Sequence, residues 1–99
     1  MAQRRGLSGP PSGYVIRGEW PEGDIDEPSA RAAQEVALRL ASAMDGRSLR
    51  AVGDLTGVNH TTVRAILIGD TWPDFVSLDR LSTGLGVDLW PRSLGRKGK

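Results

Sequence analysis

The sequence contains no cysteine, a single histidine and few aromatic residues. Without cysteine there can be neither a disulfide framework nor a thiolate metal site. The histidine, His60, has no further cluster of ligands near it in the sequence and is interpreted as a surface residue, so no metal site is expected. The chain also has no run of about 18 apolar residues that would span a membrane, and no apolar segment typical of a secretory signal follows its first arginines. These absences favour a cytoplasmic protein.

The residues that most enzymes require are scarce as well. No glycine-rich phosphate loop is present, and the carboxylates are scattered over expected helix caps and surfaces. The sequence therefore predicts neither an enzyme nor a bound cofactor. Its 99 residues allow one domain, and 38% apolar with 25% charged residues is the composition of a globular chain.

The net charge of +1 is unevenly distributed. Residues 1–28 carry three basic and five acidic side chains, a net of −2, whereas residues 29–99 carry ten and seven, a net of +3. The basic excess is strongest in residues 92–99, which are expected to be a flexible tail. A positive bias favours an anionic partner, although a net charge of +3 is also common on proteins that bind no anionic partner.

The chain divides into a leader, a helical domain and the tail. Residues 1–13, rich in Gly, Pro, Ser and Arg, are expected to be disordered. Residues 14–20 (YVIRGEW) predict one short strand or an extended packing arm, and residues 21–28 an acidic connector. The domain itself is expected to cover residues 29–91.

From Ser29 onward, apolar residues recur every three or four positions, which predicts an all-α domain of four or five short helices. The expected helices cover residues 29–44, 48–56, 59–68 and 74–85, with Ser29, Ser48, Asn59 and Asp74 as their N-terminal caps. A last single turn over residues 87–91 would close the core with Leu89 or Trp90. The residues expected to face inward are Ala33, Val36, Ala37, Leu40, Ala41, Met44, Leu49, Val52, Leu55, Val63, Ile66, Leu67, Phe75, Leu78, Leu81 and Leu85.

The second and third expected helices, joined by a short glycine turn, have the length and spacing of a helix-turn-helix. Gly53 supplies a small residue where the two helices would cross, and Gly57 tolerates the positive φ that the turn requires. Val58, Val63 and Ile66 would anchor the later helix against the earlier one.

Residues 48–87 resemble the Cro and Xre type of helix-turn-helix, the lambda-repressor-like fold, in the segments TGVNHTTV, ILIGDTWPDF and LDRLSTGLGV. With the preceding helix, the resemblance covers about two thirds of the chain. It implies a bacterial, nucleoid-associated transcriptional regulator, a repressor that excludes other proteins sterically from double-stranded DNA. Two positions depart from the family: Leu49 stands where many relatives have a phosphate-bracing glutamine, and Gly84 where alanine is usual.

The resemblance implies that residues 59–68 enter the major groove. His60, Thr61, Arg64 and Ala65 would face the bases, with Asn59 and Thr62 nearer the backbone. The residues expected to contact DNA are Ser48, Arg50, Asn59, His60, Thr61, Thr62, Arg64, Ala65 and Ile68. A guanidinium can bond guanine O6 and N7 together, and the absence of acids between Leu55 and Gly69 suits a polyphosphate surface.

A homodimer is expected, because one recognition helix reads too few base pairs for useful specificity. The fourth helix with the C-terminal turn and the strand at residues 14–20 are both candidate dimer surfaces. The alternative function is a protein-interaction module of the antitoxin or adaptor kind, in which the acidic residues 19–27 would dock a basic partner or cover the basic face. Trp72 is expected to pack on the edge of the core in preference to the sugar-phosphate backbone.

Overall fold

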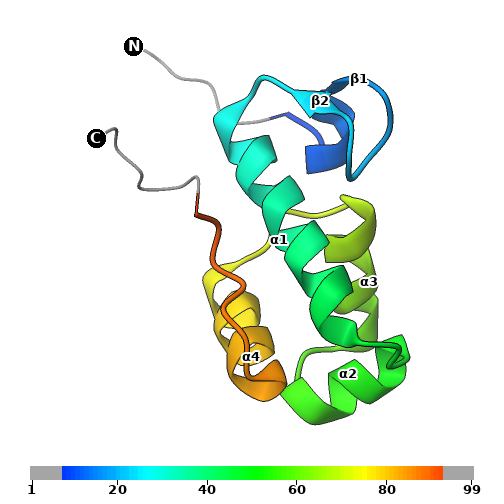
Figure 1. Ribbon diagram of the computed structural model, residues 1–99, viewed down its shortest axis with the longest axis vertical. Coiled ribbons are helices and arrows are strands. Elements are labelled where there is room, and N and C mark those ends of the chain that lie inside the picture. Colours follow the sequence, from blue (N-terminus) through cyan, green and yellow to red (C-terminus); the bar gives the residue numbers. More distant parts are fainter. Residues whose placement is uncertain (1–7, 93–99) are drawn as a thin grey trace.

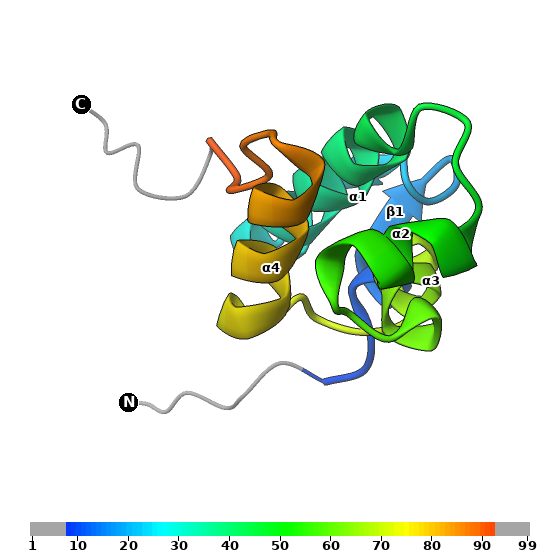
Figure 2. The ribbon, with the colours of Figure 1, turned by 90° about the horizontal axis from the view of Figure 1, so that it is seen from below.

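The computed structural model describes residues 8–92, in which four helices pack with a two-stranded sheet (Figure 1). The elements are a 3-10 turn η1 (Pro11–Tyr14), β1 (Val15–Arg17), β2 (Asp24–Ile25), α1 (Pro28–Met44), α2 (Leu49–Thr56), α3 (His60–Ile68) and α4 (Phe75–Leu85). α3 and α4 lie on opposite sides of the long helix α1, and Figure 2 shows the same arrangement from below. The expected compact, mostly helical fold is confirmed. None of the described helices is long and apolar enough to cross a membrane.

Three of the four predicted helix caps are confirmed. The side-chain oxygens of Ser48, Asn59 and Asp74 each accept a hydrogen bond from a backbone N–H in the first turn of α2, α3 and α4, at 3.0, 2.8 and 2.7 Å. Each bond pairs a donor that has no partner inside its own helix. Gly57 and Gly69 end α2 and α3 in the left-handed conformation, with φ of 80° and 76°.

The predicted cap of α1 is wrong by two residues. Glu27, not Ser29, caps this helix, and its carboxylate accepts hydrogen bonds from the N–H groups of Ser29 and Ala30 at 2.8 and 3.3 Å. Pro28 occupies the first helical position, where its fixed φ suits a helix and its missing N–H costs nothing. The proline therefore moves the start of the helix upstream of the serine.

The core lies between α1 and the three shorter helices. Its buried residues are Val36, Leu40, Val52, Val58, Val63, Ile66, Leu78, Leu81 and Leu89. Leu89 comes from the predicted last turn, but residues 87–91 form bends and irregular backbone and not a helix. Between the two expected alternatives, Leu89 closes the core and Trp90 stays partly exposed.

Three residues expected to face inward are exposed: Ala41, Leu55 and Phe75. In α2 the inward position belongs to Thr56, which lies one helical turn after Val52. The Thr56 hydroxyl donates to the Val52 carbonyl oxygen at 2.7 Å and accepts from a backbone N–H at 3.2 Å, so it is buried without loss of hydrogen bonds. The periodicity of apolar residues could not identify Thr56 as the core residue, because its burial depends on the hydrogen bonds of its hydroxyl group.

The expected single strand at residues 14–20 is one arm of a hairpin. β1 pairs with β2, which comes from the expected acidic connector, in antiparallel register. Pro11 is buried, and the Ser12 N–H donates to the Gly69 carbonyl oxygen at 2.9 Å. The expectation of disorder is therefore wrong for residues 8–13, since Ser8 and Gly9 also make hydrogen bonds, while residues 1–7 and the tail at 93–99 lie outside the described residues. Residues upstream of the expected domain start at Ser29, among them Pro11 and Ser12, thus pack against the helices.

Two tryptophans attach the N-terminal segment to the helices. The Trp20 indole N–H donates to the Leu67 carbonyl oxygen at 2.9 Å, at the C-terminal end of α3. The Trp72 indole N–H donates to the Gly9 carbonyl oxygen at 3.1 Å, and its ring meets Tyr14 edge-on with centroids 6.0 Å apart. The Trp72 ring thus packs on the N-terminal segment, and the Trp20 indole fixes the hairpin against α3.

Candidate nucleic-acid interface

α2 and α3 are joined by a short turn that brings their backbones into close contact. Gly57 takes a φ of 80° in this turn. A Cβ atom at Gly53 would lie 2.9 Å from the Val58 carbonyl oxygen and 3.4 Å from the His60 nitrogen, so only glycine fits there without a shift. The two glycines have the roles that the sequence predicted for them, and they set the angle at which α3 leaves α2.

α3 has one buried and one accessible face. Val63 and Ile66 are almost completely buried against the other helices. The accessible face carries exposed Asn59, Thr61, Arg64 and Ile68 together with half-buried His60, Thr62 and Ala65. Residues separated by three or four positions are neighbours on a helix, so these side chains form one continuous strip. The structure therefore brings together all seven residues that were predicted on α3 and its cap.

The N-terminal end of this strip is a small hydrogen-bonded unit. The Asn59 side-chain oxygen accepts from both the N–H and the hydroxyl of Thr61, at 2.8 and 2.6 Å. This oxygen is therefore committed to holding the helix, which removes the oxygen half of the paired contact by which asparagine reads adenine. The Asn59 amide nitrogen is the group left for an anionic partner, in agreement with its predicted place near the backbone.

A hollow at the α2–α3 turn has a volume of about 210 Å³ and is lined in part by Arg50, Asn59 and His60. Arg50 thus lies beside the start of α3, as a phosphate contact there would require. Ser48 does not line this hollow, and its oxygen is engaged as the cap of α2. Asp54 also lines the hollow, and sequence analysis did not include it in the interface.

A second hollow, of about 330 Å³, lies between α3 and the loop that precedes α4. Thr61, Thr62 and Ala65 line it together with Thr71, Trp72 and Asp74, among other residues. Sequence analysis missed Thr71 and Asp74 as interface residues, because a loop carries no periodicity that would direct a side chain toward α3.

Asp74 is charged at neutral pH. Hydrogen bonds from the backbone N–H of Ser77 and, next in importance, from its hydroxyl hold the pKa of the Asp74 carboxyl below its ordinary value, because both donors stabilise the ionised form. This negative charge belongs to the cap of α4 and lies at the rim of the second hollow.

The charges around α3 are balanced in number. Residues 47–74 contain three arginines, Arg47, Arg50 and Arg64, and three aspartates, Asp54, Asp70 and Asp74. The aspartates lie at the ends of the helices, while α3 itself carries only Arg64. Among the described residues Arg64 has no ion-pair partner, so its guanidinium is available to a ligand.

Comparisons with protein-family models, with curated proteins and with solved structures give no significant match to this chain. Within residues 8–92, no group of three or more histidine, aspartate and glutamate side chains is placed to hold a metal ion.

Proposed function

We propose that the chain is a sequence-specific regulator that binds double-stranded DNA, with α2 and α3 acting as a helix-turn-helix and α3 lying in the major groove. The observation that carries the proposal is the accessible, acid-free face of α3, at whose centre lies Arg64, which has no ion-pair partner within residues 8–92. Such a face suits a groove lined by phosphates and base edges. A dimer of the chain would act as a repressor in the cytoplasm by occupying its operator.

The side chains divide by the contacts their chemistry allows. Arg64 reads guanine through two parallel hydrogen bonds, while Ala65 and the Thr61 methyl group contact a thymine methyl. His60 offers a ring nitrogen to a neighbouring base edge. Arg50, on α2, contacts a phosphate and contributes no sequence information.

Selection of binding sites from random DNA tests this division with the wild type and three variants. We expect Arg64→Ala to cost about 1–3 kcal/mol on the selected site and to relax the preference at one base pair. Arg50→Ala should weaken binding to all sequences about equally. Arg80→Ala is the matched control, since Arg80 is an exposed arginine on α4. Each variant is melted first to show that it is folded.

Two results would contradict different parts of the proposal, one the role of Arg64 and the other DNA binding itself. An Arg64→Ala protein that selects the wild-type motif unchanged would remove Arg64 as a base reader and leave His60 and Thr61 to read the site. A wild-type chain that binds no DNA even at low salt would overturn the regulator as a whole.

The second candidate is a protein-interaction module, favoured by the equal numbers of arginines and aspartates around α3. Protein partners accept mixed charges, whereas polyphosphate repels aspartate. Ile68, which is 44% exposed on the same face, would add apolar contact area for such a partner. Absence of DNA binding in the experiment above is the outcome that would favour this function.

A further inference from the structure

A small apolar pocket opens on the side of the molecule where α4 begins. Its walls include Ala32, Val36, Trp72, Leu78 and Trp90, and its volume is about 130 Å³. None of these five side chains carries a formal charge, so the pocket suits an apolar group. We refer to it as the tryptophan pocket.

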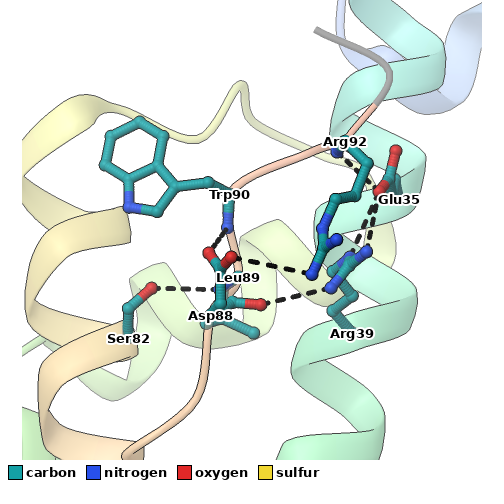
Figure 3. Close-up of polar contacts among 7 residues, drawn as sticks. All are labelled: Glu35, Arg39, Ser82, Asp88, Leu89, Trp90 and Arg92. Atoms are coloured by element: carbon teal, nitrogen blue, oxygen red, sulfur yellow. Dashed lines mark hydrogen bonds and ion pairs between the residues drawn. The ribbon is translucent and has the colours of Figure 1, made fainter. Parts of the chain in front are cut away.

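The Trp90 wall of this pocket is held in place by polar contacts on both sides of it in the chain (Figure 3). Before it, the Leu89 N–H donates to the Ser82 hydroxyl oxygen at 3.2 Å. After it, the Arg92 N–H donates to a Glu35 carboxylate oxygen at 2.7 Å. The Trp90 N–H itself donates to the Asp88 side chain at 3.1 Å. The backbone that carries the indole is therefore fixed before any partner arrives.

An exposed aromatic side chain lies next to the tryptophan pocket. Phe75 is 72% exposed, and its ring centroid is 5.3 Å from that of Trp90. Val76 beside it is 54% exposed. Phe75 is thus a projecting apolar group that contacts one wall of the pocket from outside, and its exposure to water is unfavourable.

The projecting ring and the pocket match in size. An apolar protein cavity of about 150 Å³ accommodates benzene, so a pocket of about 130 Å³ is on the scale of a phenyl ring. Because Phe75 and the pocket adjoin on one surface, two copies related by a two-fold axis can each insert Phe75 into the pocket of the other. We propose that this surface is a self-complementary dimer interface, with Phe75 as its anchor and a second copy of the chain as its partner.

This interface has a direct route to the proposed DNA surface. Trp72 lines the tryptophan pocket and also the hollow beside α3. Filling the pocket therefore fixes the loop that borders α3 as well as the distance between the two α3 helices. This dimer interface rests on the proposed function, which expects a homodimer. Dimerisation is measured without DNA, so the dimer interface and the DNA-binding function can each fail independently of the other.

Sedimentation of the full-length chain from about 1 μM to about 1 mM tests the interface, because this range covers the dissociation constants of weak dimers. We expect the wild type to dimerise as its concentration rises, and Phe75→Ala to raise the dissociation constant at least about tenfold. Ile16→Ala is the matched control: Ile16 is 59% exposed on β1, the competing candidate for dimerisation, and its removal should change nothing.

Filling the pocket is the second test. Ala32→Leu adds apolar atoms at the wall of the tryptophan pocket and should also prevent dimerisation, provided that thermal melting shows the variant to be folded. If Ala32→Leu does not fold, the Phe75→Ala result alone decides the proposal.

Three results would overturn the proposal. These are a wild type that stays monomeric throughout, a Phe75→Ala protein that dimerises like the wild type, and a loss of dimer in Ile16→Ala alone. Leu94→Ala identifies a competing occupant, since Leu94 is the apolar residue of the tail. If only this variant dimerises, the tail of the same chain fills the pocket and the proposed partner is wrong.

Discussion

Gly84 lies where α4 packs closely against the end of α2. A Cβ atom there would lie 2.8 Å from the Cα and the methyl carbon of Thr56, and 3.1 Å from the Leu55 carbonyl oxygen. At this position α4 approaches the end of α2 so closely that only glycine fits without a shift. Sequence analysis noted glycine here as a departure from the more usual alanine, and the close contact with Thr56 is a physical reason for a glycine.

Gly84→Ala should therefore destabilise the protein. Alanine in a helix interior gains about 1 kcal/mol over glycine, but contact with the α2 backbone forces a shift that costs about 1–3 kcal/mol. We expect a lower melting temperature and a lower free energy of unfolding in urea. Thr83→Ala, at an exposed neighbour in α4, is the control and should leave stability nearly unchanged. A more stable Gly84→Ala protein would show that α2 and α4 separate easily.

Asp74 gives a pH dependence of known sign. Its pKa is lowered in the folded state by hydrogen bonds from Ser77, so its stabilising effect is present above its unfolded pKa and is lost as pH falls through the folded value. Asp74→Asn keeps a good cap without the charge. The wild type should be the more stable at pH 7, with a difference that shrinks below about pH 4.

Urea denaturation of the two proteins between pH 2 and pH 7, as approximate limits around the carboxylate range, measures this difference. Asp79→Asn controls for removing a carboxylate from α4 at a position outside the cap. A gap between wild type and Asp74→Asn that is unchanged at low pH would contradict the role assigned to the ionised cap.

At the scale of helices and strands, local chemistry was predictable and long-range contacts were not. Ser48, Asn59 and Asp74 were identifiable as caps because a cap depends on residues within one helical turn. The buried face of α3 followed in the same way from its own periodicity. The strand β1 was expected from its β-branched residues, whereas β2 is only two residues long and its sequence carries little strand signal, so their pairing was not predicted.

In the candidate site, too, the residues of one helix were predictable and the residues contributed by other elements were not. The strip on α3 was predictable because its residues share one helix, whereas Asp54 and Thr71 join it from other elements. Thr56 and Leu55 show the limit most clearly, since the more apolar of these neighbours is the exposed one. A periodicity of hydrophobic residues cannot include a threonine that satisfies its own hydroxyl within the helix.

The hairpin should stabilise α3 through Trp20. Trp20→Ala removes the indole hydrogen bond to Leu67 and the ring that covers Gly69, so we expect a loss of about 2 kcal/mol for this half-buried side chain. Amide hydrogen exchange should quicken at the C-terminal end of α3. Ile16→Ala changes an exposed residue of the same hairpin and serves as control. Unchanged melting of Trp20→Ala would mean that residues 11–25 are dispensable for the helical domain.

Over the whole molecule, the two proposed surfaces meet at the loop between α3 and α4. Trp72 borders both of them and donates its indole N–H to Gly9. The N-terminal segment, the α3 face and the tryptophan pocket therefore share one side chain. A change at Trp72 is expected to affect DNA binding and dimerisation together, unlike changes at Arg64 or Phe75, each of which belongs to one surface.

The salt dependence of DNA binding tests the charge of the whole molecule. Each phosphate neutralised on duplex DNA lowers log affinity by about 0.9 per decade of salt. If Arg47 and Arg50 are the phosphate contacts and Arg64 contacts a base, the slope is about −1.8 per bound chain. Replacing the four basic residues of the tail by glutamine separates their share, because contacts made by the tail would steepen the wild-type slope beyond this value. Fluorescence anisotropy over a salt series measures both proteins, and a slope near zero would show that binding releases no counterions and does not involve the DNA backbone.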